Sequence, residues 1–121
     1  NKIITILGLS FKPNTDDVRE STSIKIASLL INLGVQIKSY DPQAMNNAKK
    51  ILPNIEYCLS ISDACKESDA IIIATEWNEF RALDFNKIKN HIKRPIIFDL
   101  RNIYNQNDFE KLDLEYHGIG K

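Results

Sequence analysis

The sequence predicts an α/β fold, a three-layer domain with a mostly parallel sheet of about five to six strands. Two observations predict it. Short apolar runs rich in β-branched residues alternate with helical patterns, and no repeat, linker or low-complexity tract interrupts that order. Strands that alternate with helices form parallel sheets through right-handed crossovers. The 121 residues fit a single domain over residues 1–121.

The first strand and helix have clear sequence signals. Residues 3–8 are β-branched and nearly continuous, which is typical of a strand covered on both faces. Residues 21–33 carry an apolar stripe with helical spacing. Hydroxyl side chains at residues 21–23 can cap the start of this helix, and Gly34 can close it.

The next strand and helix meet at an Asp-Pro pair. Residues 35–40 form a strand pattern that ends before Asp41 and Pro42. Pro42 cannot continue a β-ladder, and Asp41 can cap a helix expected over residues 43–52.

The second half of the chain continues the alternation and completes a Rossmann-like domain. Its most apolar run, residues 69–74, is expected to be a central strand, and the last strand is expected at an edge of the sheet. The expected elements are a strand over 55–58, a helix over 61–67, a strand over 69–74, a helix over 85–92 and strands over 95–99 and 114–118.

Composition excludes several classes of protein. Lys and Arg total 16 against 16 Asp and Glu, whereas nucleic-acid binders carry a basic excess. A charged fraction of 26% without like-charge blocks argues against disorder, and no apolar run approaches the ~20 residues that span a bilayer. We therefore expect no nucleic-acid or membrane partner. The chain starts at Asn1 and enters a strand pattern at once, which predicts a piece of a longer protein.

Cys58 and Cys65 are too few for a disulfide framework and lack a nearby His for metal binding. We expect both to be small buried hydrophobic residues and expect no metal site. A reducing, cytoplasmic location fits this usage.

Polar side chains follow several of the predicted strands. Ligands of open parallel sheets bind beyond the carboxyl ends of the strands. Lys12, Arg19 and Arg101 follow such ends, and so does Trp77. Lys and Arg suit phosphate, so these three cations predict an anion site, with Asp16, Asp17 or Glu20 available to hold Arg19. The alternative is that the charges pair among themselves on a solvated loop.

The loop after the first strand contains no glycine beyond Gly8. It is therefore neither a phosphate-binding P-loop nor a dinucleotide-binding turn, and we expect no independent NAD site in this domain. Asp41 occupies the place of a ribose-binding acid, but helix capping is the favoured role. Trp77 is open to two roles, stacking on a base or sugar and packing of the loop.

A receiver-like signalling module is the rival from a different class, with Asp41 or Asp99 as phosphoacceptor. A receiver needs paired acids after its first strand and a Lys after its fifth. Here residues 9–11 are Leu-Ser-Phe and the late residue is Arg101, so the pattern fails. Serines without a His close in sequence give no support for nucleophilic catalysis.

The run at residues 8–21 closely resembles a signature of the UDP-glucose/GDP-mannose dehydrogenase family, at the opening of its carboxyl-terminal nucleotide-sugar-binding domain. Further matches follow at residues 40–42, 75–80 and 98–102, so the resemblance covers essentially the whole chain. The Pro-Asn-Thr-Asp-Asp and Thr-Glu-Trp elements look most like the branch that oxidises UDP-glucose. Branches that oxidise N-acetylated UDP-sugars or GDP-mannose share much of the first motif.

The resemblance implies oxidation of UDP-glucose to UDP-glucuronate with two NAD per turnover, within nucleotide-sugar metabolism for polysaccharide biosynthesis. It implies that Phe11, Lys12 and Arg101 contact the UDP-sugar, whose pyrophosphate supplies the anion. It also implies that Arg19 reaches NAD, which is held mainly by an amino-terminal domain. The full-length enzyme would be a homodimer or larger.

The catalytic residues of this family are not in this sequence. Its catalytic cysteine lies in an upstream Gly-Gly-x-Cys segment, which neither Cys58 nor Cys65 matches. The NAD-binding glycine turn and the central helical part are also upstream in the family. We therefore expect the chain alone to be inactive and to bind UDP-sugar weakly at best. A stand-alone nucleotide-binding module remains a third interpretation.

Overall fold

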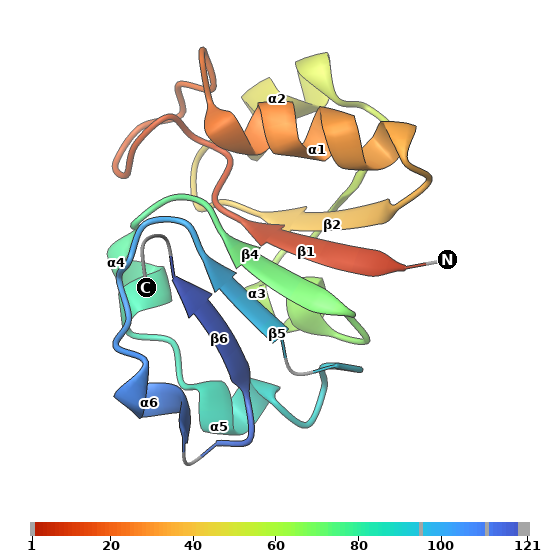
Figure 1. The fold of residues 1–121 in the computed structure, drawn as a ribbon. Helices are drawn as coiled ribbons and strands as arrows, with labels where there is room; N and C mark the ends of the chain where they lie inside the picture. Colours follow the sequence, from red (N-terminus) through yellow and green to blue (C-terminus); the bar gives the residue numbers. More distant parts are fainter. Residues whose placement is uncertain (1, 95, 111, 119–121) are drawn as a thin grey trace.

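Six parallel strands form one sheet in the computed structural model, which describes residues 2–94, 96–110 and 112–118 (Figure 1). The strand order is β3-β2-β1-β4-β5-β6. The strands β2 and β3 are added on one side of β1, and β4, β5 and β6 are added on the other, so the switch in strand order lies between β1 and β4. The predicted α/β fold is confirmed. The strands are β1 (Ile3–Leu7), β2 (Gln36–Tyr40), β3 (Glu56–Tyr57), β4 (Ala70–Ile73), β5 (Ile96–Asp99) and β6 (Glu115–Gly118). Pro95, where the predicted strand over 95–99 begins, lies outside the described residues.

The register brings the carboxyl ends of the strands to one edge. Leu7 pairs with Tyr40 on one side and with Ile73 on the other. Ile73 pairs with Asp99, and Asp99 pairs with Gly118. The segments after β1, β4 and β5 therefore leave the sheet side by side, on the left in Figure 1.

Helices cover both faces of the sheet. The α1 and α2 helices lie on one face, and α3, α5 and α6 lie on the other (Figure 1). Within the described residues, none of the helices is long and apolar enough to cross a membrane. The helices are α1 (Thr22–Asn32), α2 (Met45–Ile51), α3 (Ile61–Cys65), α4 (Asn78–Arg81), α5 (Phe85–Ile88) and α6 (Asn107–Glu110).

Apolar side chains of alternating strand residues fill the two interfaces. Leu7 and Ile73 face a cluster that contains Phe80, Phe85 and other buried aromatic rings. The neighbouring residues on the strands face α1 in a smaller cluster with Ala27. This alternation explains why the strands read as nearly continuous apolar runs, since both of their faces are covered.

Three predicted helices are shorter in the structure, each for a local reason. Asp41 binds the backbone N–H groups of residues 43 and 44 in a turn, so α2 starts only at Met45. Glu67 has a positive φ of 62°, which ends α3 before it. The predicted helix over 85–92 stops at Ile88, and His91 instead accepts a hydrogen bond from the backbone of Glu67 at 2.6 Å.

The hydroxyl cap predicted for α1 is wrong, although its glycine end is confirmed. Ser21 stands at the N-cap position without a side-chain capping bond, because its buried Oγ donates to the carbonyl of Leu9 at 2.8 Å. Gly34 has a φ of 85° and donates to the carbonyl of Ile31. Glycine adopts this left-handed conformation without the penalty of a Cβ.

The two cysteines are free and buried, as predicted. Burial raises the pKa of Cys65 to about 12 and also raises that of Cys58. Both thiols are therefore neutral near pH 7, which argues against a nucleophilic role.

Candidate functional site

The chain leaves β1 through a tight contact with the segment after β4. Gly8 has a φ of 99°, and a Cβ built on it would lie 2.5 Å from Oγ1 of Thr75. The Thr75 hydroxyl in turn donates to the carbonyl of Ser10 at 3.0 Å. Only glycine fits here, and it brings the residues before Phe11 and Lys12 against the start of the Thr75-Glu76-Trp77 segment.

Asp41 is the centre of a buried hydrogen-bond network at this edge. It is fully buried directly after β2. Six donors among the described residues bond its two oxygens. These are the backbone N–H groups of Leu9, Ser10, Gln43 and Ala44, the Ser10 hydroxyl and the Trp77 indole N–H. One carboxylate thus ties together the segments that follow β1, β2 and β4.

The network decides the open roles of Asp41 and Trp77. Trp77 is 6% exposed and donates its indole N–H to Asp41 at 3.2 Å, so it packs the loop and offers no stacking surface. Asp41 holds the turn before α2, whereas the predicted helix cap is wrong in position, because Ala44 is the N-cap. The oxygens of Asp41 are occupied by protein donors, so it presents neither a ribose-binding nor a phosphoacceptor carboxylate.

The residues present do not fit NAD in the crevice of this sheet. A dinucleotide-binding turn needs a glycine that lets a pyrophosphate approach and an acid for the ribose. Here Gly8 is packed against Thr75, and the carboxylate of Asp41 is engaged by protein donors on both oxygens.

Arg19 projects from the loop after β1 and is held by Asp17. Its Nε and Nη2 donate to the two Asp17 oxygens at 3.0 and 2.9 Å, and its backbone N–H donates to Oδ1 at 2.9 Å. These bonds lower the pKa of Asp17 to about 2. The Arg19 side chain is nevertheless 87% exposed.

Phe11 and Lys12 lie on the outer surface of the same loop. Phe11 is 50% exposed, and its backbone N–H donates to the carbonyl of Asp17 at 2.7 Å. Phe11 lines an open pocket of about 420 Å³ with Asp17, Arg19 and Glu20. The Lys12 side chain is exposed, and its ammonium makes no hydrogen bond or ion pair with any described residue. The structure thus brings Phe11 and Arg19 into one pocket, with Lys12 beside it in sequence.

Arg101 is held at both ends after β5. Its backbone N–H donates to Asp99 Oδ1 at 3.1 Å. Its Nε and Nη2 donate to the two oxygens of Glu76 at 3.1 and 3.0 Å. The Arg101 hydrogen bonds hold the pKa of Glu76 below its usual range. The guanidinium therefore lies beside the segment after β4, outside the pocket that Phe11 lines.

Asp99 shapes the turn that presents Arg101. Its side chain is fully buried, and Oδ2 accepts hydrogen bonds from the Tyr104 backbone N–H and the Tyr116 hydroxyl at 3.0 and 2.7 Å. Asn102 follows with a positive φ of 55°. Because its oxygens are engaged in this turn, Asp99 does not have the exposed carboxylate that a phosphoacceptor needs.

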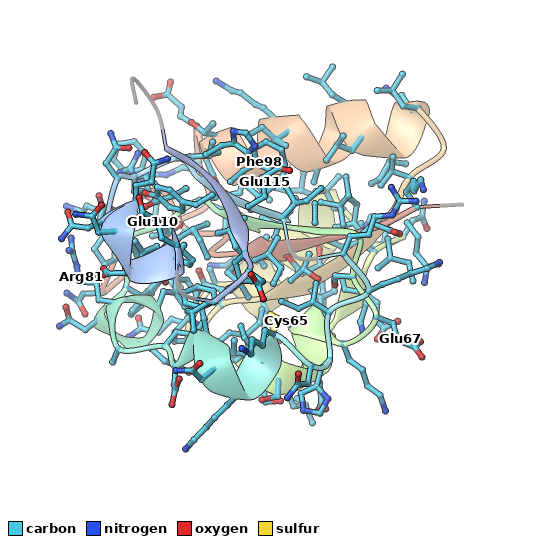
Figure 2. The ribbon with its side chains drawn as sticks, turned by 60° about the horizontal axis from the view of Figure 1, so that its bottom comes forward. Cys65, Glu67, Arg81, Phe98, Glu110 and Glu115 are labelled. Atoms are coloured by element: carbon cyan, nitrogen blue, oxygen red, sulfur yellow. The ribbon has the colours of Figure 1, made fainter. Side chains whose placement is uncertain are left out.

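Glu76 and Arg81 lie at the same edge as the candidate site, and sequence reasoning did not single them out. Glu76 was visible only as part of the Thr-Glu-Trp element. Arg81 ends α4, and its positive charge also lowers the pKa of Glu76. Figure 2 places Arg81 and Glu67 on opposite sides of the molecule, so Arg81 belongs to the carboxyl edge. The signal was weak because α4 is a single turn, too short to show a helical period.

The arrangement suits binding of an anion. Lys12, Arg19 and Arg101 all follow strand ends at one edge, and the two arginines keep Nη1 without a hydrogen bond to any described residue. The described part of the chain contains no cluster of His, Cys, Asp or Glu that could hold a metal ion. The Ser10 hydroxyl lies 2.8 Å from the carbonyl of Lys12 and 3.3 Å from Oδ2 of Asp41, so it is engaged inside the loop.

Curated relatives match nearly the whole chain. A UDP-glucose 6-dehydrogenase of Rhizobium meliloti is 44% identical over 118 residues, which cover 98% of this chain and 27% of that protein. One of Rickettsia conorii is 46% identical over 121 residues, with 98% and 28% coverage. The chain thus spans about a quarter of the length of these relatives.

Solved structures share the fold. A UDP-glucose dehydrogenase of Pyrobaculum islandicum superposes with a TM-score of 0.81 at 30% identity, covering 98% of this chain and 25% of that one. A UDP-D-ManNAc dehydrogenase of Pyrococcus horikoshii gives 0.80 at 29%, covering 99% and 26%. The family model for the UDP-binding domain of the UDP-glucose/GDP-mannose dehydrogenase family matches residues 5–106. The chain therefore belongs to the UDP-glucose/GDP-mannose dehydrogenase family.

Proposed function

We propose that this chain forms the nucleotide-sugar-binding side of the active-site cleft in a longer, NAD-dependent dehydrogenase that oxidises UDP-glucose to UDP-glucuronate. The family match to a UDP-binding domain supports the ligand class. The names of the curated relatives support UDP-glucose as the sugar. The amino-terminal NAD-binding part and the catalytic cysteine would lie outside this chain.

Phe11, Lys12 and Arg101 bind the UDP-sugar in this proposal. The observation that carries it is the setting of Arg101. Glu76 fixes its guanidinium, and Nη1 bonds none of the residues that the structure describes, so it can bind a ligand. Lys12 adds an ammonium at the same edge that pairs with none of the described residues, and Phe11 adds an exposed ring. Two cations and one aromatic face match a pyrophosphate joined to an apolar-faced base or sugar.

The residues of this chain bind and orient rather than react. The cations neutralise the pyrophosphate, and the network around Asp41 keeps the Lys12 loop against the segment after β4. Arg19, held by Asp17, reaches out to NAD bound by the other part of the protein. When bound, NAD supplies the hydride acceptor for the oxidation.

Within the family, an N-acetylated UDP-sugar or GDP-mannose is the alternative substrate. The names of the curated relatives favour UDP-glucose. A receiver-like signalling role is disfavoured, because Asp41 and Asp99 are both fully buried. We also propose a cytoplasmic location, where buried thiols such as Cys65 stay reduced, and a homodimeric or larger full-length enzyme.

Alanine variants of the full-length protein test the UDP site. Lys12→Ala and Arg101→Ala should each weaken UDP binding by about 1.5–3 kcal/mol, the scale of charge-assisted hydrogen bonds. Isothermal titration calorimetry with UDP measures this. Lys87→Ala, which removes the side chain of an exposed lysine in α5, is the matched control and should bind UDP like the wild type. Unchanged UDP affinity in both site variants would contradict the assigned roles.

A separate variant tests the cofactor side. Arg19→Ala should raise KM for NAD and leave UDP affinity close to wild type, because its partner lies across the cleft. Steady-state kinetics with varied NAD and calorimetry with UDP separate the two effects. If Arg19→Ala weakened only UDP binding, Arg19 would contact the nucleotide sugar and not NAD.

A further inference from the structure

Two arginines at the carboxyl edge are held by the same kind of contact. In each, Nε and Nη2 donate to the two oxygens of one carboxylate, Asp17 for Arg19 and Glu76 for Arg101. Such a side-on pair fixes the plane of the guanidinium and directs Nη1 away from the carboxylate.

The two pairs differ in burial. The side chains of Arg101 and Glu76 are 35% and 27% exposed, whereas Arg19 is 87% exposed. An exposed pair competes with water and orders its arginine weakly. The half-buried Arg101 pair can hold one conformation, and the bond from the Arg101 backbone to Asp99 fixes the other end of the residue.

The negative charge of Glu76 is unfavourable beside a site that binds an anion. Its pKa lies below the usual range, so it is ionised near pH 7 and repels a phosphate by Coulomb's law. Glu76 can favour binding of the ligand only if it orients the guanidinium of Arg101. Ordering an arginine before the ligand arrives saves the conformational entropy that binding would otherwise lose.

We propose that Glu76 is a positioning residue for the UDP-sugar. It holds the Arg101 guanidinium so that Nη1 points at the phosphate of the ligand. This inference rests on the proposed function, because it assumes that Arg101 binds the nucleotide sugar. It assigns a role to the glutamate of the Thr-Glu-Trp segment, whose Trp77 is already tied to Asp41.

A double-mutant cycle in the full-length protein tests the proposal, with UDP as the probe in calorimetry. Glu76→Gln keeps the shape of the side chain and removes its charge. It should weaken UDP binding roughly three- to tenfold, the scale of one side chain that is no longer pre-ordered. In the Arg101→Ala background, the same change should leave UDP affinity unchanged or increase it, since only the repulsion is then removed.

The matched control is Glu67→Gln, the same change at an exposed residue before β4 on the other side of the molecule (Figure 2). It should leave UDP affinity at the wild-type value in either background. Thermal unfolding of each variant, followed by circular dichroism, checks that the fold is kept. Arg101→Lys is a second probe, because an ammonium cannot form the side-on pair. In the Arg101→Lys background, Glu76→Gln should therefore not weaken UDP binding.

The outcomes separate the two proposals. An equal loss of affinity from Glu76→Gln with and without Arg101 would show that Glu76 does not act through Arg101. Unchanged or tighter UDP binding by Glu76→Gln alone would also overturn the positioning role while leaving the UDP site intact. A folded wild-type protein that does not bind UDP would overturn the proposed function, and the positioning role with it.

Discussion

Asp41 lies buried where β2 ends, and its two oxygens accept hydrogen bonds from the segments that follow three strands. We predict that Asp41→Asn lowers the free energy of unfolding by about 2–4 kcal/mol. An amide cannot accept on both sides, so donors such as the Leu9 N–H and the Trp77 indole would lose their partner. Urea denaturation followed by circular dichroism measures the change.

Asp16→Asn is the control for that substitution, since Asp16 is exposed and its side chain bonds no described residue. Its free energy of unfolding should stay within about 0.5 kcal/mol of wild type. Equal stability of the two variants would show that the hydrogen bonds around Asp41 contribute nothing net.

Residue types predicted part of this site. The pairing of Arg19 with an acid of its own loop is confirmed, because it depends on a group two residues away. Asp41 does bind backbone N–H groups two and three residues on, but they belong to the turn before α2, whose N-cap is Ala44. The bond between Arg101 and Glu76 joins residues 25 apart and depends on sheet register, so no local pattern could predict it.

At the scale of elements, two glycines with left-handed backbones make a matched pair. Gly34 lies just after α1, where an added Cβ would meet nothing within 4 Å. Gly8 lies just after β1, where an added Cβ would clash with Thr75. Gly34→Ala should cost about 1 kcal/mol, the penalty of a left-handed backbone alone. Gly8→Ala should cost clearly more, about 3 kcal/mol or above, because the new Cβ also clashes with Thr75.

Chemical denaturation of both variants measures this difference. The excess for Gly8→Ala reports how tightly the segments after β1 and β4 are packed. Equal losses for the two variants would mean that the Thr75 segment moves away freely, and that the edge is less rigid than the structure indicates.

The strands were easier to predict than the helices. Each predicted strand exists, and its described ends are shifted by one residue at most, because β-branched runs covered on both faces have a strong local signal. The short helices α4 and α6 were missed, since single turns have no apolar period. The ends of α2, α3 and α5 were misplaced because hydrogen bonds or backbone turns at Asp41, Glu67 and His91 set them.

For the whole molecule, the carboxylates set the response to acid. The pKa values of Asp69 and Glu76 are lowered, chiefly by hydrogen bonds from the Ile3 backbone and from Arg101. In the unfolded chain these groups regain ordinary pKa values and bind protons at a higher pH than in the folded chain. The free energy of unfolding should therefore be level between about pH 7 and 5 and fall below about pH 4.

Urea denaturation at pH 7, 5 and 3 measures this profile. Glu76→Gln should reduce the fall between pH 5 and 3, because one of the groups that take up protons on unfolding is gone. A stability that is unchanged down to about pH 3 would contradict the assigned carboxylate bonds.

For the whole molecule, we propose that this chain supplies one side of a nucleotide-sugar dehydrogenase cleft and none of its reacting groups. The most direct measurement is the NADH formed per UDP-glucose consumed, for the full-length protein and for the 121-residue chain alone. We predict two NADH per UDP-glucose for the full-length protein and none for the chain. NAD reduction by the chain alone, or no NADH from the full-length protein with any nucleotide sugar, would contradict the account.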